Sequence, residues 1–335
     1  MHTSGKQKKL SGFNLQIDPL IKKALVAAGI HGDADAPFPD LATWRQQVAD
    51  YGRTIAAMPT KYDAGVIIHD RKIPVGNMQE EVRVRIYSPF ISQAPLPVFL
   101  WMHGGGMLGG TPEQDDGQMK QIVAEGGMIV VSVDYRVAPE YPFPIPLQDC
   151  YDALIWVANH PTELNADVHR IAIGGASGGG GLAAALALKV KKEGGPRLLH
   201  QSLTYPMLDD RNQTASSHEI IALGLWDRAY NLYAWEAYLG TPQQRKKVPV
   251  PASPARVRDL TGLPPAFIAV GALDLFRDED IIYAKRLMEA GISVELHFYA
   301  GAVHGFDWYA AGENMARTFL QKRLLALKAA LEFPT

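Results

Sequence analysis

A serine between two glycines near the middle of the chain constrains the fold more than any other feature. Ser177 stands between Gly175 and Gly179 in the pattern Gly-x-Ser-x-Gly. A short run over 170–174 with β-branched residues precedes it, and helix-forming residues over 182–189 follow it. A strand, a sharp turn and a helix in this order strain the serine backbone and expose its hydroxyl. The pattern predicts a nucleophile, whereas the alternative, a glycine-rich helix start, assigns the serine no chemistry.

A glycine run, Gly104 to Gly106, follows His103 and a buried strand pattern over 98–102. Backbone N–H groups in such a run can point into a cleft, and acyl transfer needs donors where the carbonyl oxygen becomes charged. The run precedes the serine, in the order that this chemistry uses. The other interpretation is a flexible turn beside a buried histidine. Together with the serine pattern, the sequence favours an oxyanion hole.

The base and its acid partner are expected beyond the serine, at strand ends. Among the ten histidines, His304 follows the strand pattern over 294–299 in a glycine-flanked loop, where a mobile base has room. A second strand pattern, over 266–270, leads to Asp274. Asp278 falls in the first turn of the next helix, where an acid favours the helix dipole. We therefore predict His304 as the base and Asp274, rather than Asp278, as the acid.

The order Ser, Asp, His is that of the α/β-hydrolases, and the motifs resemble those of the hormone-sensitive-lipase-like family of bacterial esterases. The resemblance rests on His103 to Gly106, Asp134 to Glu140, Gly175 to Gly179, Asp274 to Asp278 and His304 to Phe306. The chain departs from it in two places. Many relatives carry Asp-Ser-Ala where this chain has Ala176-Ser177-Gly178, and many carry proline where this chain has Leu275.

The resemblance implies Ser177 as nucleophile, His304 as base and Asp274 as the acid that orients it. It further implies an oxyanion hole made by the N–H groups of Gly105, Gly106 and Gly178. Segments of about 1–58 and 207–251 correspond to a helical cap over the active site in the family. The second segment carries aromatic residues that either line a pocket or pack the cap: Trp226, Tyr230, Tyr233, Trp235 and Tyr238. The resemblance is also compatible with a homodimer.

Strand patterns alternate with helical patterns along the chain. Strands are expected near 65–69, 82–87, 97–102, 128–134, 170–174, 199–205, 266–271 and 293–299, and helices near 148–159, 279–290 and 311–331. Alternation after an opening hairpin indicates a mostly parallel sheet with helices on both faces. We therefore predict a single α/β-hydrolase domain over residues 1–335, with an eight-stranded sheet and a helical cap.

Composition argues against several other classes of protein. The formal net charge of −2 does not indicate nucleic-acid binding. The single cysteine, Cys150, excludes an intramolecular disulfide and fits a reducing, cytoplasmic compartment. The N-terminus lacks the apolar core of a signal peptide, and the uncharged stretch over 171–188 contains the glycine-rich serine turn, so no membrane association is expected. No metal-ligand spacing is present, and no cofactor or metal is expected.

The sequence therefore predicts a serine carboxylic ester hydrolase that acts on small, short-acyl esters through an acyl-enzyme intermediate. The short acyl chain is expected from the resemblance and from bulky residues near the site: Phe13, Met107, Leu108, Trp226 and Trp235. One alternative is an amide, carbamate or lactone hydrolase with the same triad. Another is a non-catalytic protein that binds a small ligand on a hydrolase fold. The plant gibberellin receptors resemble this family and lack the catalytic histidine, whereas His304 is present here.

Overall fold

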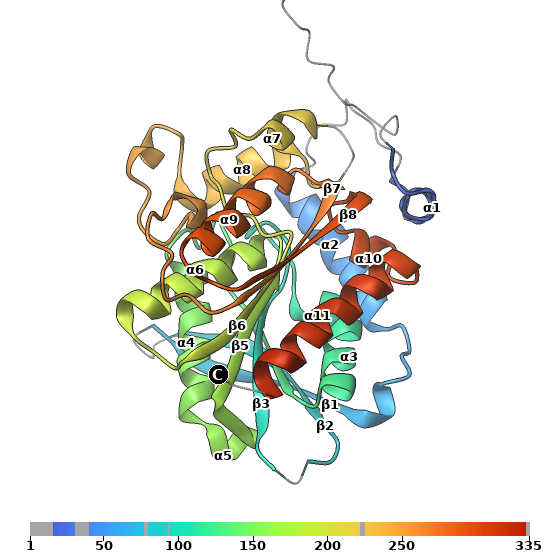
Figure 1. Ribbon diagram of the computed structural model, residues 1–335. Coiled ribbons are helices and arrows are strands. Elements are labelled where there is room, and N and C mark those ends of the chain that lie inside the picture. The colour runs from blue at the N-terminus through green and yellow to red at the C-terminus, as the bar shows by residue number, and fades with distance from the viewer. Residues whose placement is uncertain (1–15, 31–39, 77–79, 93, 222–224, 333–335) are drawn as a thin grey trace, which may run out of the picture.

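A central sheet of eight strands organises the chain (Figure 1), in a computed structural model that describes residues 16–30, 40–76, 80–92, 94–221 and 225–332. The strands are β1 (Val66–Val75), β2 (Glu80–Pro89), β3 (Leu96–Met102), β4 (Ile129–Asp134), β5 (Ala166–Ala176), β6 (Leu198–Thr204), β7 (Ala266–Leu273) and β8 (Val294–Val303). Their order across the sheet is β1-β2-β4-β3-β5-β6-β7-β8. The pairs β1/β2 and β2/β4 are antiparallel, and the remaining pairs are parallel.

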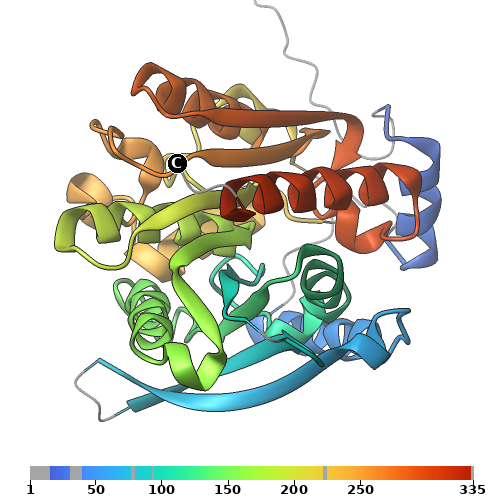
Figure 2. The ribbon, with the colours of Figure 1, turned by 60° about the horizontal axis from the view of Figure 1, so that its bottom comes forward.

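Helices cover both faces of this sheet (Figures 1 and 2). They are α1 (Pro19–Ala27), α2 (Leu41–Ala56), α3 (Asp116–Gly126), α4 (Ile145–Asn159), α5 (Pro161–Leu164), α6 (Gly178–Glu193), α7 (Ala215–Glu219), α8 (Arg228–Leu239), α9 (Arg277–Glu289), α10 (Phe306–Tyr309) and α11 (Asn314–Glu332). Figure 1 shows α3 and α11 on one side of the sheet and α4, α6 and α9 on the other. The predicted α/β-hydrolase fold, with its mostly parallel eight-stranded sheet, is confirmed.

The central strands are buried on both faces, as parallel strands covered by helices must be. In β3, every residue from Pro97 to Met102 is buried, and its aromatic side chains pack against one another, with the Phe99 and Trp101 ring centroids 5.6 Å apart. Neighbouring parallel strands end at one edge of the sheet. Ligands bind outside the carboxyl ends of strands in such sheets, so this edge is where a functional site is expected.

Several strands run further than the sequence pattern indicated, β5 and β8 among them. β5 begins at Ala166 and β8 continues to Val303, past the expected end at Tyr299. Glycine weakens a strand because its backbone loses more entropy on folding and it has no side chain to pack. The sequence around Gly301 therefore indicated a loop. Gly301 has a φ of 72°, and pairing resumes at Leu273 and Val303 after an irregularity. The extended strand brings its carboxyl end directly to residue 304.

The uncharged stretch over 171–188 divides between a strand and a helix. Its first part belongs to β5 and its second part to α6, with Ser177 between them. No helix in the described part of the chain is long and apolar enough to cross a membrane.

The helices α2 and α8 stand apart from the strand–helix alternation. The α2 helix packs against the 3₁₀ turn Pro112–Asp115 and against α3. The α1 helix lies near α10, and the Asp18 N–H donates to the Gly301 carbonyl oxygen at 3.0 Å. These contacts bring the N-terminal helices to the carboxyl end of the sheet.

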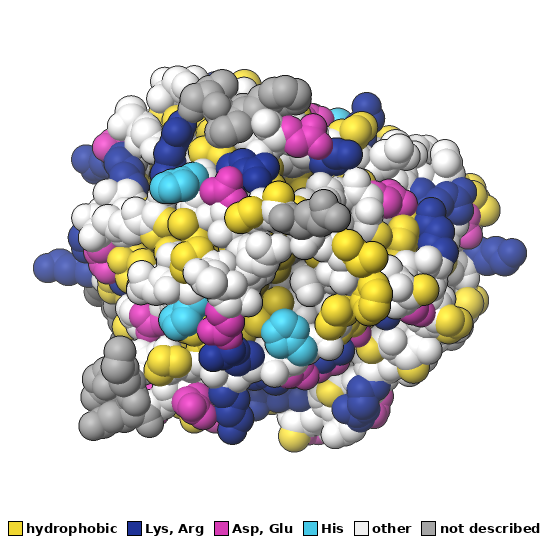
Figure 3. Space-filling view, turned by 90° about the horizontal axis from the view of Figure 1, so that it is seen from below, with side chains coloured by type: hydrophobic (Ala, Val, Ile, Leu, Met, Phe, Trp, Pro, Cys, Tyr) yellow, Lys and Arg dark blue, Asp and Glu magenta, His cyan; other side chains and the backbone are white. Residues whose placement is uncertain are grey.

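The face seen in Figure 3 carries basic and acidic side chains interspersed with one another. Hydrophobic side chains are scattered between them rather than gathered into one broad area. Single exposed apolar side chains of this kind are normal for protein surfaces.

Candidate active site

Ser177 occupies a strained backbone position at the carboxyl end of β5. Its φ of 56° and ψ of −120° lie outside the regions that non-glycine residues favour. Hydrogen bonds hold this conformation. The Ser177 N–H donates to the Thr204 carbonyl at 2.9 Å, and the Ser177 carbonyl accepts from Gly181 N–H at 3.0 Å and Met207 N–H at 2.9 Å. The strained turn is therefore tied to the first turn of α6 and to the end of β6.

The two flanking glycines are required by close backbone approach. A Cβ at Gly175 would lie 2.3 Å from the Gly179 carbonyl oxygen, and a Cβ at Gly179 would lie 2.2 Å from the Met102 carbonyl oxygen. Any side chain at either position would therefore push β3, β5 and the start of α6 apart. This steric restriction explains the Gly-x-Ser-x-Gly spacing in the sequence.

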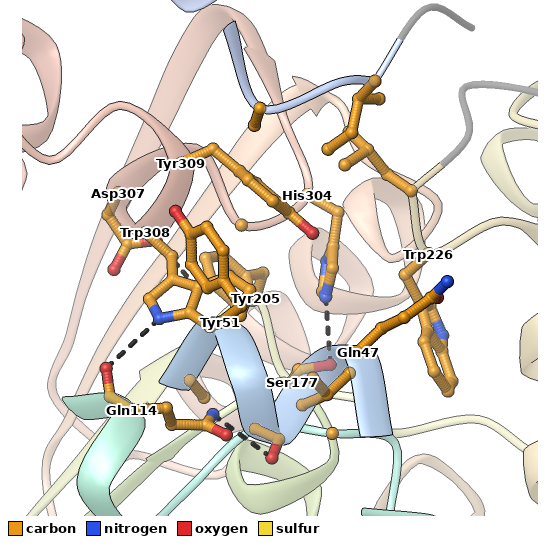
Figure 4. Close-up of a pocket in the computed structure, with 18 of the residues that line it drawn as sticks. Gln47, Tyr51, Gln114, Ser177, Tyr205, Trp226, His304, Asp307, Trp308 and Tyr309 are labelled. Carbon is orange, nitrogen blue, oxygen red and sulfur yellow. Dashed lines mark hydrogen bonds between the residues drawn. The ribbon is translucent and has the colours of Figure 1, made fainter. Parts of the chain in front are cut away.

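His304 links Ser177 to a buried carboxylate. Its Nε2 lies 3.0 Å from Ser177 Oγ, a bond drawn in Figure 4, and its Nδ1 lies 2.9 Å from Asp274 Oδ2. The Asp274 side chain is fully buried, and its Oδ1 accepts from the Phe276 N–H at 2.9 Å. With Nδ1–H donated to the carboxylate, Nε2 presents its lone pair to the serine hydroxyl. This is the arrangement that activates a serine nucleophile.

Aromatic edges hold the imidazole in place. The Tyr205 ring lies 4.5 Å from the His304 ring and the Phe276 ring lies 5.3 Å from it, both in edge-on contact. Tyr205 follows β6 immediately and has a positive φ of 34°. Sequence reasoning missed this residue, although its place after a strand end is the same signal that identified Asp274.

Asp278 binds Ser216 and Arg277 rather than His304. It lies in the first turn of α9, where its Oδ2 accepts from the Ser216 N–H at 2.7 Å and its Oδ1 accepts from Arg277 Nε at 2.7 Å. Burial raises the pKa of Asp278, but the hydrogen bonds from Arg277 and Ser216 outweigh burial and leave its pKa below the usual range. Asp278 therefore ties α9 to α7, and the structure brings Asp274 rather than Asp278 to the histidine.

The three glycines of the expected oxyanion hole lie together. Gly105 and Gly106 have φ values of 126° and 59°, and a Cβ at Gly178 would lie 2.9 Å from the Gly106 Cα. Among the described residues, neither the Gly105 nor the Gly106 N–H donates to another backbone or side-chain group. Free backbone donors beside the serine are what the stabilisation of an oxyanion requires.

Several bonds brace the glycine run from behind. Tyr135 Oη donates to the His103 carbonyl at 2.7 Å, and the Tyr135 and His103 rings stack 4.3 Å apart. Burial lowers the pKa of His103, so this histidine packs as a neutral ring. Arg45 reaches from α2 to the Leu108 carbonyl at 2.6 Å and the Ala138 carbonyl at 2.8 Å. Nothing in the sequence around Arg45 indicated that it would bind the carbonyl groups that follow the glycine run.

Trp226 lies against the same glycine run. A Cβ at Gly106 would stand 1.9 Å from Trp226 Cη2. We therefore expect Gly106→Ala to displace the loop or the indole and to lower kcat toward the loss of about 10²–10³ that removal of one oxyanion donor causes. Steady-state kinetics on a neutral ester measure the loss.

The double variant Gly106→Ala/Trp226→Ala is the matched control. It removes the clash but keeps alanine at a positive φ, which costs roughly 1–2 kcal/mol. Recovery of kcat in the double variant assigns the loss to the clash. Full activity of the single variant, in a protein with an unchanged melting temperature, would contradict the close packing of Trp226 on Gly106.

A cavity of about 470 Å³ opens beside the triad. Its described lining includes Ser177, His304 and Gly105 from the sheet edge, Trp44, Gln47 and Tyr51 from α2, Trp226 and Tyr230 from the 207–251 segment, and Asp115, Asp307 and Trp308 (Figure 4). Of the five predicted aromatic residues, Tyr233 is exposed and does not line the described cavity, and the other four divide between two uses. Trp226 and Tyr230 line the cavity, whereas Trp235 and Tyr238 are buried in packing contacts.

Some bulky residues named from the sequence lie away from the cavity. Met107, Leu108 and Trp235 are buried and are absent from its described lining. Phe13 lies outside the described residues. Their hydrophobicity predicted that these side chains would be buried. Whether a buried side chain lines a cavity or packs in the core depends on which segments surround it in the folded chain. In the described part of the chain, no group of three or more His, Cys, Asp or Glu side chains is arranged to hold a metal ion.

A serine, a histidine and a buried aspartate joined by hydrogen bonds beside free backbone donors form the site geometry of a serine hydrolase. A family model described as the alpha/beta hydrolase fold matches residues 99–307. The chain therefore belongs to this α/β-hydrolase family, the hormone-sensitive-lipase-like family that its motifs indicate.

Named relatives agree with this assignment. Esterase LipI of Mycobacterium tuberculosis is 35% identical over 325 residues, covering 94% of this chain and 95% of the relative. Carboxylesterase NlhH of the same organism is 36% identical over 253 residues, covering 75% and 79%. A solved structure titled bacterial heroin esterase superposes with a TM-score of 0.85 at 38% identity, covering 94% of this chain and 98% of that one. Fold, site and relatives together support a carboxylesterase.

Proposed function

We propose that the chain hydrolyses small, short-acyl carboxylic esters through an acyl-enzyme formed on Ser177. One observation carries the proposal. It is the continuous chain of hydrogen bonds from Ser177 Oγ to His304 Nε2, at 3.0 Å, and from His304 Nδ1 to Asp274 Oδ2, at 2.9 Å, beside a cavity. The esterases and carboxylesterases among the relatives support the same reaction class.

In the proposed mechanism, Ser177 Oγ bonds to the ester carbonyl carbon while His304 Nε2 takes the hydroxyl proton. The carbonyl oxygen becomes an oxyanion, which the N–H groups of Gly105, Gly106 and Gly178 stabilise. The intermediate collapses, the bond to the alcohol oxygen breaks, and the imidazolium proton passes to the leaving alcohol. Asp274 holds the imidazole tautomer and stabilises the imidazolium.

Water completes the proposed cycle. His304 removes a proton from water as its oxygen attacks the acyl carbon, and a second oxyanion forms in the same hole. The bond to Ser177 Oγ then breaks, the carboxylic acid leaves, and the serine regains its proton from His304. Besides the substrate and water, every proposed step uses side chains and backbone groups of this chain.

We also propose that segments 1–58 and 207–251 act as the cap of a single domain. Supporting this role, the described parts of both segments contribute to the cavity wall, through Tyr51 of α2 and through Trp226 and Tyr230. A homodimer, expected from the resemblance, and a cytoplasmic location, expected from the single Cys150, complete the proposal.

A series of p-nitrophenyl esters with increasing acyl length tests this function. Each CH₂ that the cavity buries should add up to about 0.8 kcal/mol of binding, whereas each CH₂ beyond its capacity displaces packed side chains at roughly 1–3 kcal/mol. We expect kcat/KM to peak between about two and six acyl carbons. Absence of hydrolysis throughout the series would contradict ester hydrolysis. Best turnover on emulsified long-chain triglycerides would contradict the small-ester assignment alone.

A further inference from the structure

One end of the cavity combines aromatic rings with carboxylates. In the view of Figure 4, Tyr51, Trp308 and Asp307 lie on one side of Ser177 and His304, and Trp226 lies on the other. Asp115, which precedes α3, also lines the cavity. Among the described lining residues there is no lysine or arginine. The proposed mechanism assigns no task to these carboxylates, so their place in the cavity wall needs another explanation.

Asp115 has an oxygen to spare for a ligand. The residue is only 5% exposed, and its Oδ2 accepts from Trp101 Nε1 at 2.6 Å. Within the described chain, no hydrogen bond reaches its Oδ1. Burial raises the pKa of Asp115 to about 7, which is the behaviour of a desolvated carboxyl group with too little compensating charge. A cation nearby would favour its ionised form.

Asp307 is buried beside it and is held in place by neutral donors. Its Oδ1 accepts from Tyr205 Oη at 2.6 Å and its Oδ2 accepts from Gln118 Nε2 at 3.1 Å. These bonds orient the carboxylate, and no side-chain cation of the described residues forms a contact ion pair with it. Buried charges normally have partners of opposite charge. Because Asp307 lacks such a partner among the described residues, its carboxylate adds to the negative potential of the cavity when it is ionised.

Arg323 is a buried cation whose charge acts on Asp115, but its direct contacts are with other residues. Its Nη2 donates to Gln118 Oε1 at 2.9 Å, and its guanidinium lies 5.1 Å from the Trp101 ring centroid. In the described residues it forms no ion pair within 4.0 Å of Asp115 or Asp307. One arginine also cannot balance two ionised carboxylates, so the cavity end keeps a net negative charge when both are ionised.

The rings at this end are available as cation acceptors. The Tyr51 and Trp308 centroids are 4.2 Å apart, the Trp308 and Tyr309 centroids are 5.2 Å apart, and Trp308 Nε1 donates to the Gln114 carbonyl at 3.2 Å. Side-chain cations of the described chain lie over other rings, such as Trp101, but over none of these three. Aromatic faces beside carboxylates are a recognition site for alkylammonium groups.

We propose that this end of the cavity binds a positively charged substituent of the substrate, so that the enzyme prefers small esters with an alkylammonium group to neutral esters of the same shape. The inference rests on the proposed function and names its substrate class. The cation would lie against the rings of Tyr51 and Trp308, with Asp115 Oδ1 as its unshared anionic partner. The ester carbonyl would meanwhile lie at Ser177.

Two matched pairs of esters test the preference on either side of the ester bond. Acetylcholine and 3,3-dimethylbutyl acetate differ by a cation in the alcohol part. Betaine ethyl ester and ethyl 3,3-dimethylbutanoate differ by a cation in the acyl part. Each kcat/KM is divided by the rate of hydroxide-catalysed hydrolysis of the same ester, which removes differences in intrinsic reactivity. We expect the cationic ester of at least one pair to be favoured by about tenfold or more, about 1.4 kcal/mol and within the range of cation–π attraction.

The variants Asp115→Asn and Asp116→Asn give a matched comparison. Asp116 is the adjacent residue and is equally buried, but it pairs with Arg85 and does not line the described cavity. Asp115→Asn should reduce the cationic preference by about tenfold, while kcat/KM for the neutral ester stays within about threefold. Asp116→Asn should leave the preference unchanged.

Tyr51 supplies an independent comparison should Asp115→Asn fail to fold. Tyr51→Leu removes the ring and should lower the preference, whereas Tyr51→Phe keeps the ring and should preserve it. A wild-type enzyme that favours neither cationic ester overturns the inference, as does an Asp115→Asn variant that loses activity on both members of a pair equally. Both results leave ester hydrolysis intact, since its failure would appear as absence of turnover on the neutral esters.

Discussion

Replacing Ser177 by alanine should abolish ester turnover while leaving the fold intact. Apart from its backbone bonds, Ser177 makes one side-chain hydrogen bond among the described residues, that of its Oγ with His304 Nε2 at 3.0 Å. One such bond contributes only about 0.5–1.5 kcal/mol to stability, so the melting temperature should change little. Loss of the nucleophile should lower kcat by about 10⁶, as the removal of a triad serine does in other hydrolases. Stopped-flow hydrolysis of p-nitrophenyl acetate should show an initial burst in the wild type and none in the variant.

Ser202→Ala is the matched control for this result. Ser202 lies in β6, is fully buried and has an Oγ without a partner in the described structure. Its replacement should keep both the burst and the turnover. A fluorophosphonate probe should label the wild type at Ser177 alone. Turnover that survives in Ser177→Ala, or labelling of another serine, would show that the nucleophile has been misassigned. A protein that binds the ester without any burst would support the ligand-binding alternative.

Exchange of Asp274 for asparagine should cost about 10⁴ in kcat, by analogy with the same change in serine proteases. An amide nitrogen opposite His304 Nδ1 would favour the wrong tautomer and would remove the charge that stabilises the imidazolium. The 2.9 Å bond between Asp274 Oδ2 and His304 Nδ1 is the contact that would be lost. The bond from the Phe276 N–H to Oδ1 can persist with the asparagine oxygen, so the loop should keep its shape.

Asp278→Asn, four residues further on, is the corresponding control. Asparagine there can still accept from the Ser216 N–H, and the partly exposed pair with Arg277 contributes little, about 0–1 kcal/mol. Its kcat should stay within about threefold of the wild type, since the side chain does not reach the histidine. A larger loss in Asp278→Asn than in Asp274→Asn, with both proteins folded, would reverse the assignment of the acid.

The sequence predicted those parts of the site that depend on neighbouring residues. The requirement for glycine at Gly175 is local, because a Cβ there would clash with Gly179 within the same tight turn, whereas a Cβ at Gly179 would clash with β3. The positions of Asp274 and His304 followed from a simple rule, that strand ends of a parallel sheet meet at one edge. The extension of β8 through Gly301 was missed because local glycine content argued for a loop.

Long-range contacts were beyond the same reasoning. Arg45 binds carbonyl groups at Leu108 and Ala138, residues far from it in sequence, and nothing near Arg45 indicates those partners. The bond of Tyr205 to Asp307 likewise joins the end of β6 to α10, which become neighbours only after folding. The aromatic residues of 207–251 all satisfied the pattern for a cavity wall, although Trp235 and Tyr238 are used in packing.

Local sequence by itself determined the strained serine turn, the glycine run and the approximate positions of the strands along the chain, because each is set by sterics and hydrogen bonding over a few consecutive residues. Only the tertiary structure decided the sheet order, which aromatic rings face the cavity, and that Asp115 and Asp307 line it together. The physical reason is that the cavity wall is assembled from α2, the 207–251 segment and the ends of several strands. Its charge and shape depend on where these distant segments pack, which no short stretch of sequence encodes.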